Sequence, residues 1–341
     1  MNRMSGNELL VAPFRTQKSV FEPLQSKSLL ITGGTGFFGK WLLLAIAFAN
    51  SEWKMGIKAI SLSRQPSAFL KGHGEFASLQ GVEFIAGDVR SFDARGRKFD
   101  LAIHAATDTH LKPGQTQDDS ELASIIVGGA RQILRVAKES SAQRILFVSS
   151  GAVYGQASPG QAFFSESMEC QPHTQYGKSK LEAEKLFIEE PSLACPIARC
   201  FAFAGPYLPL DAHFAIGNFV RDAVAGNEIV IKGDGSPMRS YMHAADLVVW
   251  LLKILMAGEH GRPVNVGSDE AVSIKTLAGM AARLAGRGEE LVKILGKPAP
   301  GGAANIYVPD ISRAKSELGL SLSFSLEDSL RSMIAWARSP Q

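Results

Sequence analysis

The sequence contains the stretch Thr32-Gly33-Gly34-Thr35-Gly36-Phe37-Phe38-Gly39 between an apolar run, Leu29–Ile31, and a segment of helical periodicity, Gly39–Asn50. Its three spaced glycines have distinct uses: Gly33 allows a tight turn, Gly36 lets the backbone approach a pyrophosphate, and Gly39 lets helix and strand pack closely. The free N–H groups at the amino end of the following helix favour an anion. The stretch therefore predicts a strand–turn–helix unit that binds a dinucleotide, with Phe37 and Phe38 in the same turn.

Short β-rich runs alternate with helical segments after this motif. The runs are Leu29–Thr32, Ile57–Ser63, Val82–Ala86, Leu101–His104, Ile145–Ser149 and Ile197–Phe203, and the longer helical segments are Gly39–Asn50, Asp119–Glu139 and Gln175–Glu190. Runs that are apolar almost throughout are typical of strands buried on both faces. We predict an α/β fold of the Rossmann type, a doubly wound parallel sheet with helices on both faces.

The pattern changes after Gly205-Pro206, where helices predominate. We expect three parts: an N-terminal extension (1–27), a dinucleotide-binding domain (28–205) and a smaller, mainly helical substrate domain (206–341) against the carboxyl edge of the sheet, with a strand near Val264–Val266 able to return to the sheet. The polar segment Lys112–Asp118 and His213 are further candidates to lie near the site.

The composition excludes several classes of protein. Hydrophobic residues make up 45% of the 341 residues and charged residues 20%, which suits a large core and excludes global disorder. The 36 Lys and Arg against 33 Asp and Glu leave a net charge of +3 without a basic run, so we expect no nucleic-acid partner.

The sequence also predicts where the protein resides. The apolar stretch Trp41–Ala49 is too short to span a bilayer, and residues 1–27 lack the apolar region of a signal peptide. Cys170, Cys195 and Cys200 lack the spacing of a metal site, so we expect inert thiols in a reducing compartment. A cytoplasmic protein with no metal and no membrane partner is expected.

The end of the second strand bears on the choice of cofactor. An NAD site usually offers an acid to the ribose diol there, whereas this chain has Ser63 and Arg64. A hydroxyl and a guanidinium suit a 2′-phosphate, so we favour NADP over NAD. A solvated surface arginine is the alternative role of Arg64.

Two later strand ends fit the same pocket. Asp88 and Val89 follow the third strand, where a carboxylate can accept from the adenine amino group. Ala105, Ala106 and Thr107 follow the fourth, and their small side chains let the backbone approach the cofactor. Either run is also ordinary strand-end sequence, and the order of the runs along the chain favours the binding role.

Tyr176 and Lys180 are four residues apart and share one face of a predicted helix. A phenol has a pKa near ~10, too high for a base at neutral pH. An ammonium ~5 Å away contributes about 3 kcal/mol and lowers that pKa by about 2, and an oxidised nicotinamide acts in the same direction. The alternative is that Tyr176 and Lys180 form an ordinary pair on the surface of the helix, which has the same spacing.

Ser149 and Ser150 stand at the carboxyl end of a buried strand, where open α/β sheets bind ligands. Ser150 can hydrogen-bond a sugar hydroxyl or carbonyl and keep it in register with Tyr176. Strand-end serines are also plain turn formers, but the strand-end serines, the Tyr/Lys pair and the glycine motif together favour a catalytic site.

This combination resembles the extended short-chain dehydrogenases/reductases, in particular the nucleotide-sugar epimerase/dehydratase/reductase branch, over residues 28–320. The resemblance implies that Ser150 is the catalytic hydroxyl, Tyr176 the base and Lys180 the cofactor-orienting lysine. It also implies that Ser149, and Phe201 in the run Arg199–Pro206, lie beside the cofactor. A further implication is a homodimer formed through the helices 119–139 and 175–190.

The resemblance extends to the substrate. It implies that Asn218 and Phe219, in Gly217–Val220, and Arg239, in Gly233–Tyr241, bind the diphosphate of a nucleotide sugar, with Gly151 beside Ser150 at the sugar. An arginine fork matches phosphate oxygens bidentately. A helix cap and a surface charge are the alternative roles of Asn218 and Arg239.

One difference from the family's sequence pattern restricts which reaction we expect. The family's 4,6-dehydratases place Asp-Glu directly after the catalytic hydroxyl, whereas this chain has Gly151-Ala152, which cannot transfer protons. We therefore expect a 4-epimerase or a 4-ketoreductase, with Ser63 and Arg64 favouring the reductase. A 4,6-dehydratase, a reductase of non-nucleotide carbonyls and a non-catalytic dinucleotide-binding protein are the alternatives.

Overall fold

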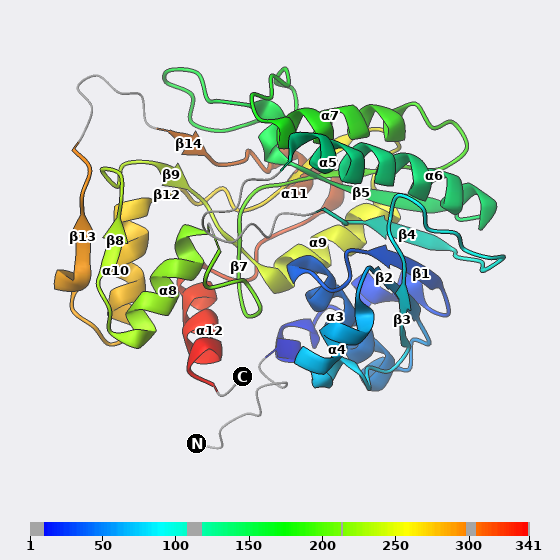
Figure 1. Ribbon diagram of the computed structural model, residues 1–341, viewed down its shortest axis with the longest axis horizontal. Helices are drawn as coiled ribbons and strands as arrows, with labels where there is room; N and C mark the ends of the chain where they lie inside the picture. Colours follow the sequence, from blue (N-terminus) through cyan, green and yellow to red (C-terminus); the bar gives the residue numbers. More distant parts are fainter. Residues whose placement is uncertain (1–9, 108–117, 213, 298–304, 340–341) are drawn as a thin grey trace.

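The computed structural model describes residues 10–107, 118–212, 214–297 and 305–339, and its centre is a seven-stranded parallel sheet (Figure 1). The strand order is β11-β6-β5-β4-β1-β2-β3, and every neighbouring pair is parallel. The strands are β1 (Ser28–Thr32), β2 (Lys58–Ser63), β3 (Val82–Ala86), β4 (Leu101–His104), β5 (Arg144–Ser150), β6 (Ile197–Cys200) and β11 (Pro263–Val266). The predicted doubly wound α/β fold is confirmed.

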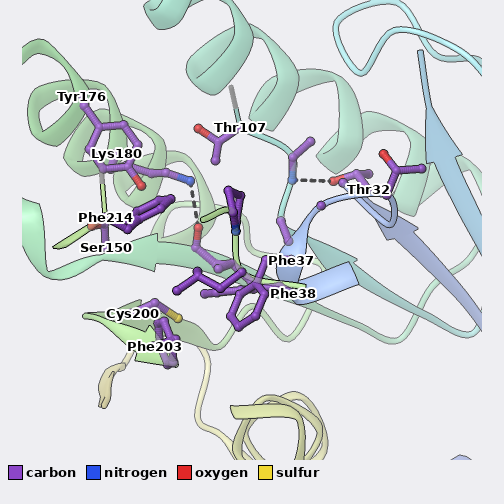
Figure 2. A pocket seen from close by; sticks show the side chains of 18 of the residues that line it. Thr32, Phe37, Phe38, Thr107, Ser150, Tyr176, Lys180, Cys200, Phe203 and Phe214 are labelled. Carbon is purple, nitrogen blue, oxygen red and sulfur yellow. Dashed lines mark hydrogen bonds between the residues drawn. The ribbon is translucent and has the colours of Figure 1, made fainter. Parts of the chain in front are cut away.

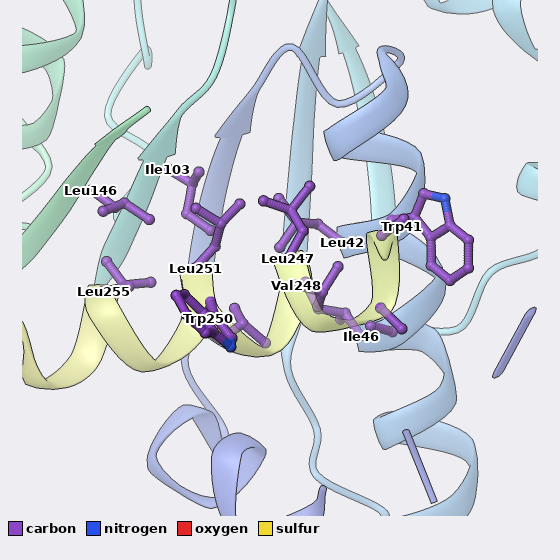
Figure 3. Close-up of a cluster of buried hydrophobic side chains, with 14 of the residues drawn as sticks. Trp41, Leu42, Ile46, Ile103, Leu146, Leu247, Val248, Trp250, Leu251 and Leu255 are labelled. Atoms are coloured by element: carbon purple, nitrogen blue, oxygen red, sulfur yellow. The ribbon is translucent and has the colours of Figure 1, made fainter. Parts of the chain in front are cut away.

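Each face of the sheet is covered by helices because successive strand residues point to opposite sides. Ile103 and Leu146 face α9 (Ala244–Ala257), as Figure 3 shows, and belong to the same buried cluster as side chains of α3 (Phe37–Trp53), while their neighbours Ala102 and Ile145 face the other layer. That layer consists of α5 (Asp119–Ala123), the π-helical turn η4 (Ser124–Gly128), α6 (Gly129–Glu139) and α7 (Gln175–Ile188). The segment predicted as one helix over 119–139 is thus interrupted by a π turn.

Residues after 205 pack into two different hydrophobic clusters. A separate apolar cluster joins α8 (Ala215–Ala225), α10 (Ile274–Leu284) and α12 (Leu326–Arg338), whereas α9, β11 and α11 (Ser312–Leu318) pack with the main sheet. Three small sheets complete this region: β7 (Phe203–Ala204) with β10 (Met242–His243); β8 (Ile229–Ile231) with β13 (Val292–Ile294); and β12 (Val272–Ser273) with β9 (Met238–Arg239) and β14 (Ile306–Tyr307).

Short helices fill the connections: α4 (Pro66–Gly72), η3 (Gly74–Phe76), η5 (Gly151–Tyr154) and η6 (Glu289–Leu291). Residues 112–117 and His213, which were candidates for the site, lie outside the described residues. Within the described ranges, no helix combines the length and the apolar character needed to cross a membrane.

The described part of the N-terminal segment belongs to the main core rather than lying apart from it. It forms η1 (Ala12–Phe14), α2 (Lys18–Phe21) and η2 (Glu22–Leu24), in which Phe14, Phe21 and Leu24 are fully buried. The ring of Phe14 lies 6.3 Å from that of Trp41, and the ring of Phe21 lies 5.5 Å from that of Trp53, both on α3. The segment therefore shields the sheet-facing helix α3 from water.

We expect Phe14→Ala to lower the free energy of unfolding by about 3–5 kcal/mol, because it removes a fully buried ring and leaves a cavity. Urea denaturation followed by circular dichroism measures the change. Ser19→Ala, on the exposed side of α2, is the matched control and should change stability by less than about 0.5 kcal/mol. A Phe14→Ala protein as stable as this control would show that the segment does not contribute to the core.

Candidate active site

The carboxyl ends of the central strands open into a cavity of about 1310 Å³. Most of the residues predicted for the site line it (Figure 2): Gly33, Gly36, Phe37, Phe38, Ser63, Arg64, Asp88, Val89, Ala105, Ala106, Thr107, Ser149, Ser150, Tyr176, Lys180, Phe201 and Arg239. Gly39, Gly151, Asn218 and Phe219 are not in this lining. The cavity lies over β1 and β4, where the strand order reverses and open α/β sheets bind their ligands.

The glycine turn after β1 is shaped so that side chains cannot fill it. Gly33 has φ +75°, and a Cβ there would lie 2.9 Å from the carbonyl of Ala105. A Cβ on Gly39 would lie 2.2 Å from Cα of Gly34, so Gly39 lets α3 start against the turn without itself reaching the cavity. The turn and the amino end of α3 thus form a cradle for a pyrophosphate, as the glycine spacing predicts.

Two threonines mark the same end of the cavity. Thr32 Oγ1 lies 2.8 Å from His104 Nδ1 and accepts from Ala106 N–H at 3.1 Å, which ties β1 to the loop after β4. Thr107 Oγ1 is buried and has no hydrogen-bond partner among the described residues. A buried hydroxyl without a partner costs free energy unless a ligand completes it, so the residues present fit a bound dinucleotide.

Arg64 and a single carboxylate, that of Asp88, also line the cavity. Ser63 Oγ lies 3.3 Å from Thr35 Oγ1, and Arg64 follows at the end of β2, where no acid stands. Arg90 holds the Asp88 carboxylate through Nε at 2.9 Å and Nη2 at 2.6 Å. Mainly because of these bonds, the pKa of Asp88 is lowered to about 2, so the group stays ionised.

The structure brings Ser150, Tyr176 and Lys180 together on one side of the cavity (Figure 2). Ser150 ends β5, its Oγ accepts from Ala152 N–H at 3.2 Å, and it lines the cavity together with Tyr176. Thr174 Oγ1 caps α7 by accepting from Gly177 N–H at 3.1 Å, so the helix presents Tyr176 in its first turn.

The pKa of Tyr176 is shifted in the direction opposite to the one expected from its spacing to Lys180. Burial raises the pKa of Tyr176 to about 12, against the opposing effect of the Ser150 hydrogen bond. The Lys180 ammonium donates to the carbonyl of Val148 at 2.9 Å and lies 5.8 Å from the Tyr176 ring centre. The predicted net lowering of this pKa is therefore wrong for this arrangement, because the desolvation of the phenolate sets the direction of the shift.

A buried ion pair supports these groups from behind. Glu184, on α7, accepts from Arg199 of β6 through Nε at 3.0 Å and Nη2 at 2.7 Å, and from Ser149 Oγ at 2.5 Å. The Arg199 guanidinium lies 4.9 Å from the ring centre of Tyr154. Glu184 follows Tyr176 and Lys180 at intervals of four, so the pair holds the face of α7 that carries them.

Not all of the predicted substrate-binding residues line the cavity. Arg239 lines the cavity, and its Nη1 donates to the carbonyls of Met238 and Asn305. Asn218 Oδ1 accepts from Arg221 instead, and Phe219 is buried in the apolar cluster of α8, α10 and α12. Contact of Asn218 and Phe219 with a diphosphate stays a prediction.

Sequence reasoning missed Tyr307, Tyr241 and Phe214, which also line the cavity. Tyr307 comes from β14, a strand of two residues, and its ring packs on Phe201 with ring centres 4.7 Å apart. No motif surrounds it, and the only signal is a lone aromatic residue after a Gly- and Ala-rich segment. Cys200 is buried at the cavity wall, and burial raises the pKa of its thiol, as expected of an inert cysteine.

The family model described as the NAD dependent epimerase/dehydratase family matches residues 29–267, more than half of the chain. The chain belongs to this family. The matched residues span the main sheet and include Ser150, Tyr176 and Lys180. The expected membership in the extended short-chain dehydrogenases/reductases, and with it an NAD-dependent enzyme of the epimerase/dehydratase type, is confirmed.

Curated and solved relatives of this epimerase/dehydratase chain are similar over nearly their full length. A dTDP-glucose 4,6-dehydratase of Streptomyces griseus is 25% identical, over 90% of this chain and 93% of the relative. An uncharacterized UDP-glucose epimerase of Bacillus subtilis is 26% identical, over 91% and 98%. The structure of MoeE5 in complex with UDP-glucose and NAD is 25% identical, with a TM-score of 0.73 over 91% and 98%.

We expect the affinity for NAD to fall about tenfold between pH 7 and pH 9, because burial lowers the pKa of Lys180 to about 8 and the cofactor loses its ammonium partner as that group deprotonates. Isothermal titration calorimetry at the two pH values measures the change. Lys180→Met should bind NAD weakly at both pH values. Lys178→Met, exposed on the same helix, should behave like the wild type. Equal affinity of the wild type at both pH values would contradict this role of Lys180.

Proposed function

We propose that the chain is an NAD(P)-dependent enzyme that acts at C4 of the sugar of a nucleoside diphosphate sugar, as a 4-epimerase or a 4-ketoreductase. The observation that carries the proposal is the meeting of Ser150, Tyr176 and Lys180 in one cavity with the Gly33 cradle and with Arg239. The cradle suits a dinucleotide and the guanidinium suits a diphosphate. The relatives named as a dehydratase and an epimerase of nucleotide sugars, and MoeE5 with UDP-glucose, support the substrate class.

The residues have separate roles in this reaction. When bound, the nicotinamide accepts or supplies the hydride of the sugar carbon. Tyr176 takes the proton of O4 when C4 is oxidised and returns it when C4 is reduced, while Ser150 holds the oxygen in register through a hydrogen bond. Lys180 donates to the ribose of the cofactor, and the fixed positive charge of Arg239 holds the diphosphate.

The neighbourhood of Gly151 favours C4 chemistry over 4,6-dehydration. A Cβ at this position would lie 2.8 Å from the Phe201 ring and from the Tyr307 hydroxyl, so a carboxylate cannot be added without displacing both of them. Ala152, next in the chain, has no acidic proton to transfer. The Arg239 guanidinium likewise favours a nucleotide substrate over a simple carbonyl compound, and the complete Ser/Tyr/Lys set favours an enzyme over a binding protein.

Two further expectations concern the assembly and the location of the protein. A homodimer through α5–α7 and a location in the cytoplasm stay predictions. On the cofactor, we propose NADP over NAD, because Ser63 and Arg64 stand where NAD sites usually carry an acid. MoeE5 was solved with NAD, so the preference has to be measured directly.

We expect Tyr176→Phe to reduce kcat by about 10²–10⁴-fold, because it removes the proton acceptor while it keeps the ring. Purified protein is assayed with UDP-glucose, dTDP-glucose and their 4-keto derivatives, and the sugar products are followed by NMR. UDP and dTDP should compete with the substrate. The absence of turnover over this set, or a Tyr176→Phe protein as active as the wild type, would refute the proposal, and a 4-keto-6-deoxy product would indicate the dehydratase instead.

We expect Arg64→Ala to raise the KM for NADPH about tenfold or more and to leave the KM for NADH unchanged, because only NADPH carries the 2′-phosphate that the guanidinium would hold. Initial rates with each reduced dinucleotide measure the two constants. Lys71→Ala, which removes an exposed charge on the neighbouring helix α4, is the control and should change neither. Equal effects of Arg64→Ala on both dinucleotides would argue for an NAD enzyme.

A further inference from the structure

Asp88 stands in the cavity wall at the end of β3, far along the sheet from the catalytic groups. In the sheet, β2 and β3 lie on one side of β1, whereas β4 and β5, which ends in Ser150, lie on the other. The glycine cradle after β1 stands between the two sides. If the cradle holds the pyrophosphate of a dinucleotide and the nicotinamide faces Ser150, the adenosine half belongs over β2 and β3.

The wall beside Asp88 suits a flat base. Leu62 and Val89 line the cavity and belong to one buried apolar cluster. Two glycines bring the chain close around them: a Cβ on Gly87 would lie 2.9 Å from Leu62 Cδ1, and a Cβ on Gly129 would lie 2.9 Å from Val89 Cγ1. The wall thus offers apolar surface with one charged acceptor next to it, which matches the apolar face and polar edge of a purine.

Arg90 fixes the orientation of this acceptor. Its backbone N–H and its Nε each donate to Asp88 Oδ1 at 2.9 Å, and its Nη2 donates to Oδ2 at 2.6 Å. Arg90 is not among the residues that line the cavity, and a Cβ on Gly128, in the π-helical turn η4, would lie 3.9 Å from its Cγ. Arg90 therefore acts on the cavity only through Asp88.

The remaining hydrogen-bonding capacity of Asp88 decides which base it accepts. A carboxylate accepts about four hydrogen bonds, and Arg90 fills two on Oδ1 and one on Oδ2, so one position on Oδ2 is left for a ligand. Because the Arg90 side-chain bonds lower the pKa of Asp88 to about 2, the group has no proton to donate at neutral pH. The C6 amino group of adenine can donate to this oxygen, whereas the C6 carbonyl of hypoxanthine would face it with a second acceptor.

We propose that Arg90 is a positioning residue of the cofactor site: its fork holds the Asp88 carboxylate so that the site selects adenine over a purine with a carbonyl at C6. The inference concerns the dinucleotide and does not depend on the sugar or on the C4 reaction. The side chains of Asp88 and Arg90 are 29% and 35% exposed, so water competes for the carboxylate and limits the selectivity.

We expect the hypoxanthine analogues of NAD and NADP to bind the wild type about tenfold more weakly than NAD and NADP themselves, because one hydrogen bond to a charged acceptor is lost. Isothermal titration calorimetry without a sugar measures the four affinities. In Arg90→Gln the ratio within each pair should fall to about twofold or less, since the released carboxylate can turn to water. Arg97→Gln, which removes an exposed arginine paired with Glu83 of β3, is the matched control and should keep the wild-type ratio.

The ratio separates a positioning role from a merely structural one. A loss of stability in Arg90→Gln would weaken both members of a pair equally and leave their ratio unchanged, and that result would overturn the proposal. A wild type that binds adenine and hypoxanthine dinucleotides equally would overturn it as well. Arg90→Lys keeps a positive charge without the fork, so its ratio should stay as low as that of Arg90→Gln. Full selectivity in Arg90→Lys would show that the charge suffices and would refute the role of the fork.

A double-mutant cycle tests whether Arg90 acts through Asp88. The amide of Asp88→Asn can accept from adenine or donate to hypoxanthine, so its ratio should lie near one. Adding Arg90→Gln to this variant should change the ratio no further. Selectivity retained in Asp88→Asn would show that another group reads the base and would overturn the assignment. Since no sugar is present, an inactive enzyme with the expected ratios would refute the proposed function alone, and an active enzyme without them would refute the role of Arg90 alone.

Discussion

The site depends on the buried ion pair between Glu184 and Arg199, which joins α7 to the sheet. Glu184 is 1% exposed and Arg199 6%, and an ionised group so far from water is tolerated only with a well-placed partner. Because Glu184 also accepts from Ser149, the pair locks α7 to both β5 and β6. A shift of the helix by even one turn would leave two buried charges uncompensated. Tyr176, two turns before Glu184, is thereby held beside Ser150.

The parallel sheet provides the second constraint. The order of the strands reverses between β1 and β4, so the glycine turn after β1 and the loop after β4 diverge and leave a crevice. Thr32 holds its two walls together through His104 and Ala106. Since both faces of the sheet are closed by helices, its carboxyl edge is where a ligand as large as a dinucleotide can enter.

The fold and one half of the site could be predicted because they depend on local patterns. The bounds of β3 and β4 agree with their apolar runs, and the glycine spacing gives the turn because Gly33 and Gly39 have steric roles that no other residue can fill. The Tyr176–Lys180 spacing likewise places both side chains on one helix face. In each case the information lies within a few residues of sequence.

The remainder depends on contacts between distant segments. Tyr307 enters the site through the pairing of two short strands 68 residues apart, which no local pattern marks. Burial of residues 12–24 against α3 depends on which helix face is left uncovered. The pKa of Tyr176 also follows from burial, a property of the packed cavity that the spacing to Lys180 does not contain.

In the proposed reaction Tyr176 acts where a hydride leaves a sugar carbon, and an isotope experiment tests this role most directly. UDP-glucose or dTDP-glucose carrying deuterium at C4 is incubated with the protein and the oxidised dinucleotide, and the nicotinamide is recovered for mass spectrometry. With the wild type, deuterium should appear on the nicotinamide or, where an epimerase returns the hydride, at C4 of the epimerised sugar; with Tyr176→Phe almost none should be transferred. Loss of the deuterium to solvent while product forms would contradict this role of Tyr176.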